Sequence, residues 1–287
     1  MKKIKTLTLL TLSVALLGSC AKGQEFSQLA LGGENVPVGQ YASKILTYFG
    51  LNETELANAG LITYGQDVKE VTSQVKESLV SAGIIYQTDA YSAGLTVVDT
   101  ASKEMCGQVI YPAAITKLST HLDASISFMS YLGSEVALTV FESVGFSRVG
   151  EATSETAQVS EVTELKIFAA ASLTETLNLI KATYEAAHPN ITLTMNFGSS
   201  GKLQTQIEQG AAGDCDIFIS AGQKQMNALD ASSGTEGAKD LIYHDSRVNL
   251  LENKVALAVP DNNPAEVTSF VVLKDKLVEA LNKRINK

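Results

Sequence analysis

Four residues stand where an apolar, strand-like run gives way to a helix-like stretch. Ser172 follows LKIFAAA, Ser200 follows ITLTMNFGS, Val38 follows LALGGENVP, and Val68 follows LITYGQD. The first backbone N–H groups of a helix have no partner within the helix, and they carry a partial positive charge. Several helix starts that converge on one point can therefore bind an anion without any Arg or Lys.

Each of these residues also has an ordinary explanation. A serine at a helix start is commonly an N-cap worth about 1 kcal/mol, so capping is the better explanation of Ser172 or Ser200 taken alone. Val38 and Val68 offer only backbone N–H groups. Tyr86, which ends the apolar run GIIY, is either a hydroxyl donor or an aromatic side chain at the rim of a site. Only the combination indicates anion binding.

The elements that must position these residues alternate along the chain. Apolar runs such as LALG, GIIY, LKIFAAA, ITLTMNF and CDIFISA are separated by amphipathic stretches such as residues 39–49, 68–80 and 173–187. This alternation predicts an α/β fold with largely parallel sheets. Residues 150–164, GEATSETAQVSEVTE, lack apolar periodicity and are predicted to be a linker. A chain of 287 residues with 45% hydrophobic content can form one large core or two modest ones.

The first twenty residues, MKKIKTLTLLTLSVALLGSC, have the parts of a secretory signal: a cationic start, an apolar stretch and small residues before Cys20. The apolar stretch is too short for a permanent membrane helix. Residues 17–20 resemble a bacterial lipobox, in which Cys20 would be acylated and become the mature N-terminus. We therefore expect an extracytoplasmic lipoprotein that touches the membrane only through its lipid anchor. The alternative is an ordinary signal peptide that contains a cysteine.

Composition excludes several other classes. The net charge is −9, and it becomes −12 without residues 1–19, which carry three lysines and no acid. An acidic protein is a poor nucleic-acid binder. Cys106 and Cys215 are expected to be free, partly buried thiols. The three histidines lack metal-ligand spacing, so we expect no metal site and no cofactor.

Several segments together resemble the periplasmic molybdate-binding proteins of ABC importers. These segments read ALGGENVPVGQYA, GIIYQTDA, IFAAASLTETL and NFGSSGKLQTQIEQGAAGDCDIFISAGQKQM, and the similarity covers about residues 26–147 and 164–275. The resemblance implies a two-lobe fold of the type II periplasmic-binding-protein class with a ligand cleft between the lobes. It also implies that molybdate or tungstate is the ligand and that an ABC importer permease is the partner. We expect a monomer, because such a receptor must dock through both lobes.

The family's ligand contacts can be carried over motif by motif. Two serine contacts fall on Ser172 in AAASLT and on Ser200 in FGSSG, and the tyrosine hydroxyl falls on Tyr86 in GIIYQTDA. Backbone contacts fall on Val38, where VPVG replaces the family's VPAG, and on Val68 in GQDVKE. The serine loop departs from the family's frequent FASSS, because glycines flank its serines and loosen it.

The order of the motifs also departs from the family. The AAASLT half usually comes first, whereas here the VPVG half precedes it and VTSFVVLKDKLVEAL lies at the C-terminus. The resemblance therefore implies a circular permutation, with residues 150–164 joining the family's usual ends. We expect lobe two, with Val38, Val68 and Tyr86, to comprise residues 25–108 and 265–287. Lobe one, with Ser172 and Ser200, would comprise residues 109–264.

The chemistry of the expected donors favours an unprotonated oxyanion. Molybdate, tungstate and sulfate are dianions at neutral pH, whereas phosphate keeps a proton that donor groups leave unmatched, at a cost of about 1 to 3 kcal/mol. Sulfate binding and a non-transport anion sensor remain alternatives. A serine hydrolase is disfavoured because the sequence has no GxSxG motif and its histidines form no triad pattern.

Overall fold

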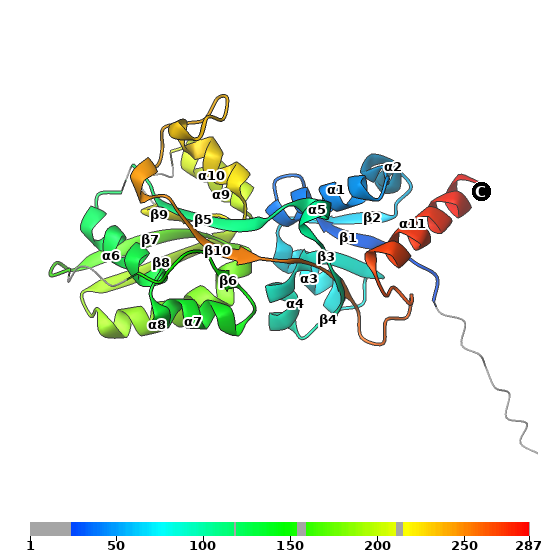
Figure 1. The fold of residues 1–287 in the computed structure, drawn as a ribbon, viewed down its shortest axis with the longest axis horizontal. Coiled ribbons are helices and arrows are strands. Elements are labelled where there is room, and N and C mark those ends of the chain that lie inside the picture. The colour runs from blue at the N-terminus through cyan, green and yellow to red at the C-terminus, as the bar shows by residue number, and fades with distance from the viewer. Residues whose placement is uncertain (1–23, 118, 154–158, 211–214, 287) are drawn as a thin grey trace, which may run out of the picture.

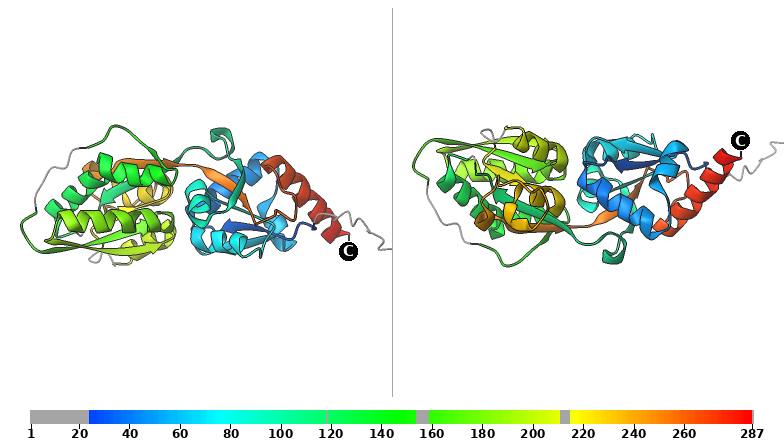
Figure 2. Two further views of the ribbon diagram at one scale, coloured as in Figure 1. Left: turned by 90° about the horizontal axis from the view of Figure 1, so that it is seen from below. Right: turned by 90° about the horizontal axis from the view of Figure 1, so that it is seen from above.

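The computed structural model describes residues 24–117, 119–153, 159–210 and 215–286. Two α/β lobes lie side by side, each built on its own sheet, and the chain crosses between them twice (Figure 1). Views turned by 90° show the same two bodies joined by extended segments (Figure 2). The expected signal peptide and Cys20 lie outside the described residues.

Lobe two is built on a five-stranded sheet. Its strand order is β2-β1-β3-β11-β4; β1 is parallel to β2 and β3, while β11 is antiparallel to β3 and β4. The strands are β1 (Leu29–Gly32), β2 (Ile62–Gly65), β3 (Ala82–Tyr86), β4 (Thr96–Thr100) and β11 (Val255–Val259). The helices are α1 (Pro37–Tyr48), α2 (Glu53–Asn58), α3 (Val68–Lys76), α4 (Gln87–Ala93), α5 (Lys103–Cys106) and α11 (Phe270–Ile285).

Lobe one is built on a six-stranded sheet of order β6-β10-β5-β9-β7-β8. β7 is parallel to β8 and β9, whereas β5 is antiparallel to β9 and β10. The strands are β5 (Val109–Ile115), β6 (Ser147–Arg148), β7 (Thr163–Ala170), β8 (Ile191–Gly198), β9 (Ile217–Ile219) and β10 (Val248–Asn253). The helices are α6 (Leu122–Leu132), α7 (Glu135–Ser143), α8 (Thr174–Ala187), α9 (Ser200–Glu208) and α10 (Gln223–Leu229), with 3₁₀ turns η1 (Ala171–Leu173), η3 (Ala231–Ser233) and η4 (His244–Ser246).

The α/β class is confirmed, but both sheets mix parallel and antiparallel pairs instead of being largely parallel, and two expected boundaries are wrong. Residues 255–259 were expected in lobe one, yet β11 pairs with β3 and β4 in the sheet of lobe two. The reason is that β11 fills the position between β3 and β4, where it satisfies the backbone groups along both of their facing edges. The predicted linker ends earlier than residue 164, because β7 begins at Thr163. Residues 154–158 of that linker lie outside the described part of the chain.

Both described ends of the chain lie in lobe two. The Gln24 backbone N–H donates to the Pro264 carbonyl at 2.7 Å. Lys283 forms an ion pair with Glu25 at 3.1 Å, and Arg284 Nη2 donates to the Ser27 carbonyl at 3.2 Å. The segment entering β1 is therefore held against the last turns of α11 (Figure 1).

The cysteine prediction is confirmed, since Cys106 and Cys215 are free and both are buried. Within the described ranges, no three His, Cys, Asp or Glu side chains gather as metal ligands would. Within the same ranges, no single helix has the length and apolar character needed to cross a membrane, and only the bent pair α6–α7 passes that test jointly.

Candidate functional site

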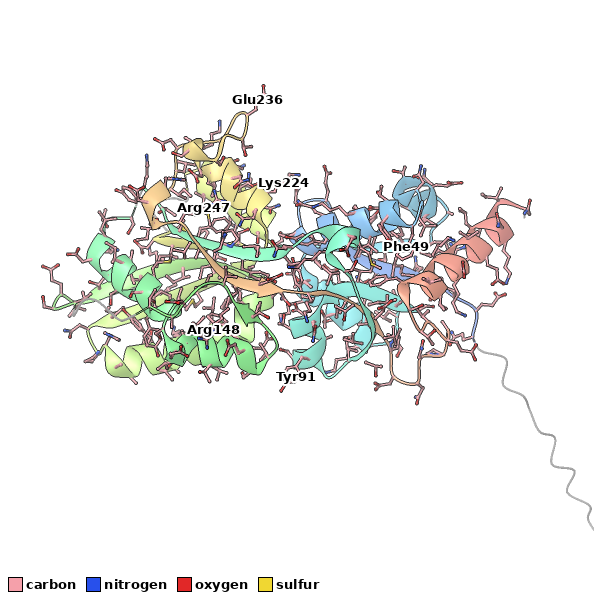
Figure 3. All side chains as sticks on the ribbon, viewed as in Figure 1. Phe49, Tyr91, Arg148, Lys224, Glu236 and Arg247 are labelled. Atoms are coloured by element: carbon pink, nitrogen blue, oxygen red, sulfur yellow. The ribbon has the colours of Figure 1, made fainter. Side chains whose placement is uncertain are left out.

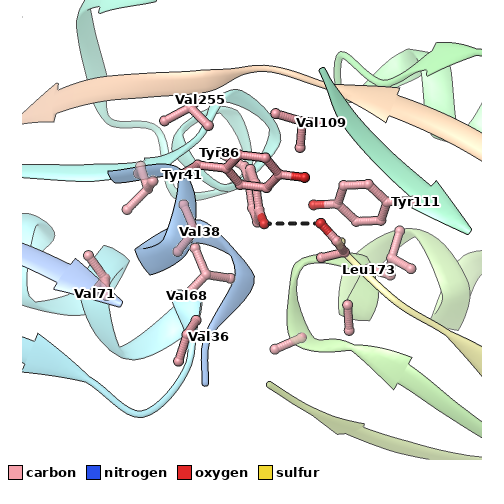
Figure 4. Packing of buried hydrophobic residues seen from close by; sticks show 14 of the residues in the cluster. Val36, Val38, Tyr41, Val68, Val71, Tyr86, Val109, Tyr111, Leu173 and Val255 are labelled. Carbon is pink, nitrogen blue, oxygen red and sulfur yellow. Dashed lines mark hydrogen bonds between the residues drawn. The ribbon is translucent and has the colours of Figure 1, made fainter. Parts of the chain in front are cut away.

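The five residues singled out from the sequence line one pocket where the lobes meet. Val38, Val68 and Tyr86 come from lobe two, and Ser172 and Ser200 come from lobe one. Figure 4 shows Val38, Val68 and Tyr86 on one side, facing the segment that carries Leu173 on the other. The rest of the lining consists of Val36, Pro37, Ala170, Ala171, Gly198, Ser199 and Ala221.

Lobe two contributes two helix N-termini to this pocket. Pro37 occupies the first turn of α1, where its missing N–H costs nothing, and Val38 follows it with an N–H that has no partner within the helix. α3 begins at Val68, and Asp67 caps it by accepting from the Glu70 N–H at 3.0 Å. Gly39 lets α1 approach the end of β1, because a Cβ there would lie 2.1 Å from the Gly32 carbonyl oxygen.

Neither Ser172 nor Ser200 of lobe one caps a helix. Ser199 is the N-cap of α9 and accepts from the Lys202 N–H at 3.4 Å. Ser200 Oγ instead accepts from the Ala221 N–H at 3.0 Å, and Ser172 Oγ lies 2.9 Å from the Tyr111 hydroxyl. The capping explanation is therefore wrong for Ser172 and Ser200.

The two lobes already touch across the pocket. The Tyr86 hydroxyl donates to the Ala221 carbonyl at 3.4 Å, and the Gly201 N–H donates to the Asn35 carbonyl at 3.1 Å. The space among the lining residues measures about 10 Å³, close to what one water molecule needs. Burial, followed by the proximity of Tyr111, raises the pKa of Tyr86 well above its ordinary value, so this hydroxyl keeps its proton as a donor.

The pocket gathers donors without an arginine. The chain has three arginines, and each is bound elsewhere: Arg148 to Glu135 and Glu142, Arg247 to Asp230, and Arg284 to backbone carbonyls beside α11. Figure 3 shows both Arg148 and Arg247 on lobe one. Any anion held here would therefore depend on hydroxyl groups and helix N-termini.

A family model described as bacterial extracellular solute-binding protein matches residues 19–147 and 165–282, which is most of the chain. The chain belongs to this family. Its fold is that of the type II periplasmic binding proteins. A phosphate-binding protein of a phosphate ABC transporter from Streptococcus pneumoniae superposes with a TM-score of 0.53 and 14% identity, covering 90% of this chain and 99% of that one. At this identity the likeness concerns the fold alone.

Two sequence relatives match part of this solute-binding protein. YvgL of Bacillus subtilis, whose name describes an ABC transporter substrate-binding lipoprotein, is 37% identical over 125 residues, which are 43% of this chain and 47% of YvgL. The molybdate-binding protein ModA of Haemophilus influenzae is 31% identical over 118 residues, 41% of this chain and 42% of ModA. The matched segments thus span less than half the length of each relative.

The solute-binding protein has a charged contact between its lobes that no sequence motif indicated. Lys69, next to Val68 on α3, lies 2.9 Å from Asp89 Oδ1 in its own lobe and 2.6 Å from Glu175 Oε2 on α8 of lobe one. Burial opposes the charge on Lys69, but Asp89 and Glu175 raise its pKa on balance. Lys69 thus links the lobes beside the pocket.

Asp89 should make the stability of the solute-binding protein fall as the pH rises. Its side chain is fully buried, and burial raises its pKa to about 6 even though Lys69 favours the charged form. The folded state then binds a proton more tightly than the unfolded chain, whose aspartate pKa is about 3.9. Stability is therefore lost between about pH 4 and pH 6, by about 2 to 3 kcal/mol.

Asp89→Asn is expected to remove this part of the pH dependence, because the amide does not titrate. Urea unfolding at several pH values between 4 and 7 would measure it, with the exposed Asp123→Asn as the matched control. Equal slopes in the wild type and Asp89→Asn would show that Asp89 is not the group responsible.

Proposed function

We propose that this protein captures molybdate or tungstate outside the cytoplasm and delivers it to the permease of an ABC importer. The observation that carries the proposal is the convergence of five donor positions, Val38, Val68, Tyr86, Ser172 and Ser200, from both lobes on one pocket. The name of the ModA relative supports molybdate in particular.

Binding from both lobes gives the ligand a way to control closure. An anion that accepts hydrogen bonds from Ser172 and Ser200 on one side and from Tyr86 on the other stabilises the closed state selectively. An oxyanion is larger than one water molecule, so the pocket must widen beside Tyr86 to admit it. The direct bond from Tyr86 to the Ala221 carbonyl would then be exchanged for a bond to the ligand.

Selectivity would follow from the lack of a carboxylate among the described lining residues. Without a carboxylate, a protonated oxyanion such as hydrogen phosphate leaves its proton unmatched. Sulfate meets the same donors as molybdate and is the second candidate ligand. A hydrolase is disfavoured, because the partners of Ser172 and Ser200 are Tyr111 and the Ala221 N–H rather than a histidine.

We further propose a monomer that is lipid-anchored at Cys20 and whose halves are circularly permuted relative to the molybdate-binding family. The lipobox-like residues 17–20 support the anchor. The order of VPVG before AAASLT supports the permutation. The sheet of lobe one also supports the permutation. It contains both β6 and β7, so the segment that joins the family's usual ends connects two strands of one lobe.

A thermal melt of the chain without residues 1–20 would test the function. Molybdate and tungstate at equal concentration are expected to raise the melting temperature, by an amount corresponding to about 2.7 kcal/mol at a hundred times Kd, because a ligand stabilises the state it binds. Sulfate should raise it less, and phosphate should leave it unchanged. A cooperative melt that no anion shifts would rule out the oxyanion assignment.

A further inference from the structure

The side-chain amide of Asn253 has a fixed orientation at the point where β10 leaves lobe one. Its Oδ1 accepts from the Lys254 backbone N–H at 2.8 Å. A backbone N–H can only donate, so the oxygen must face it and the NH₂ group must face the other way. Nδ2 accordingly donates to Thr88 Oγ1 at 2.9 Å and to the Tyr111 hydroxyl at 3.2 Å. Asn253 is 3% exposed, so water does not compete for these bonds.

The orientation of Asn253 determines what Tyr111 does with its proton. The Tyr111 hydroxyl is fully buried, accepts from Asn253 and lies 2.9 Å from Ser172 Oγ. Burial raises the pKa of Tyr111 well above its ordinary value, so the proton stays on the hydroxyl. Because an NH₂ group cannot accept, this proton must point away from Asn253, toward Ser172 Oγ or toward the neighbouring Tyr86 hydroxyl.

The same reasoning applies to the neighbouring hydroxyl. The Tyr111 ring packs against Tyr86, with ring centroids 5.7 Å apart, and Tyr111 contributes to the raised pKa of Tyr86. A Tyr111 proton turned toward Tyr86 would likewise leave that hydroxyl to donate elsewhere. Only a Tyr111 proton turned toward Ser172 makes Ser172 a donor to a ligand, and Ser172 Oγ, at 2.9 Å, is the acceptor that the geometry favours.

We propose that Asn253 and Tyr111 form a hydrogen-bond relay that makes Ser172 a donor toward the bound anion, and that this relay strengthens discrimination against protonated oxyanions. The inference rests on the proposed anion site. Ser172, already accepting from Tyr111, has its own proton available for the ligand. Bonds in such a chain polarise one another, so a Ser172 that accepts from Tyr111 donates more strongly. Tyr111 and Asn253 are thus positioning residues that act through Ser172 without lining the pocket.

Tyr111→Phe removes the relay and keeps the ring. Molybdate affinity is expected to fall by about five- to tenfold, the effect of one hydrogen bond. Phosphate binding is expected to weaken less, because a Ser172 hydroxyl released from Tyr111 can turn and accept the phosphate proton. The ratio of molybdate to phosphate affinity should therefore fall, which a purely structural defect would not produce. Isothermal titration of both anions measures this ratio.

Tyr41→Phe is the matched control. The Tyr41 ring also packs against Tyr86, with ring centroids 6.5 Å apart, and its hydroxyl makes no hydrogen bond among the described residues. This variant is expected to keep the molybdate affinity and the selectivity of the wild type. An equal change in both variants would overturn the relay.

A double-mutant cycle with Ser172→Ala tests whether Tyr111 acts through Ser172. If it does, Tyr111→Phe has little further effect on molybdate affinity once Ser172 is alanine. Additive losses would overturn the relay while leaving the anion site standing. A wild-type protein that binds none of the anions would instead overturn the proposed function, and the assignment of Tyr111 with it.

Discussion

Replacing Gly201 with alanine is expected to weaken anion binding by about 100-fold while leaving both lobes folded. Gly201 lies in the first turn of α9 in lobe one, directly against Asn35 of lobe two. A Cβ at this position would lie 2.2 Å from the Asn35 carbonyl oxygen and 2.9 Å from the Asn35 Cβ. Real Cβ atoms do not approach a backbone oxygen so closely, so the lobes must separate. Helix α9 itself tolerates the change, because alanine is a better helix former than glycine.

Isothermal titration with molybdate measures the loss, and small-angle scattering with and without ligand measures closure. The matched control is Gln204→Ala on the same helix, whose half-exposed side chain bonds, among the described residues, to Glu208 of α9 alone. We expect this control to bind and close as the wild type does. Wild-type affinity in Gly201→Ala would mean that the lobes do not close on the ligand through the contact between Gly201 and Asn35.

Alanine substitutions at the adjacent Ser199 and Ser200 are expected to have different effects, one on stability and the other on anion affinity. Ser200→Ala removes a fully buried hydroxyl that faces the pocket, and it also leaves the Ala221 N–H without its acceptor. A hydrogen bond to a charged ligand is worth about 1.5 to 3 kcal/mol, so molybdate affinity should fall by about 10- to 100-fold. Ser199→Ala removes the N-cap of α9 instead, which should lower the free energy of unfolding by about 1 kcal/mol.

Each variant serves as the control for the other. Urea unfolding without ligand and titration with molybdate, performed on both proteins, separate the two effects. We expect Ser199→Ala to keep most of its affinity and Ser200→Ala to lose most of it. The reverse pattern would show that Ser199, and not Ser200, carries the ligand contact.

The sequence predicted the positions of the donor residues, but it did not predict the hydrogen bonds that join Ser172 to Tyr111 and Asn253. The junctions at Val38, Val68, Ser172 and Ser200 could be found because each lies where an apolar run meets a helix start, and such junctions meet at the carboxyl ends of parallel strands. Tyr86 was recognised only through its motif. Local patterns could not decide whether Ser172 is a cap or a donor, because its partner, Tyr111, is 61 residues away in sequence.

The features that were missed depend on which strands and helices become neighbours. The contact between Asn253 and Tyr111 exists because β10 lies beside β5 in antiparallel register. The sequence of either strand alone does not predict which strand becomes its neighbour. The link from Lys69 to Glu175 joins residues 106 apart on different lobes. The lobe boundary was misplaced for the same reason, since VALAV is equally apolar whichever sheet it enters.

Because β11 is the last strand in the chain, lobe one can fold before the sheet of lobe two is complete. Lobe one is a continuous segment whose strands all precede residue 254, so it can form while the rest of the chain is still being made or secreted. The sheet of lobe two cannot, because β11 lies between β3 and β4 and arrives last. Loss of the C-terminal segment would therefore spare lobe one and leave the other half of the cleft unfinished, with the edges of β3 and β4 open to pairing with another chain.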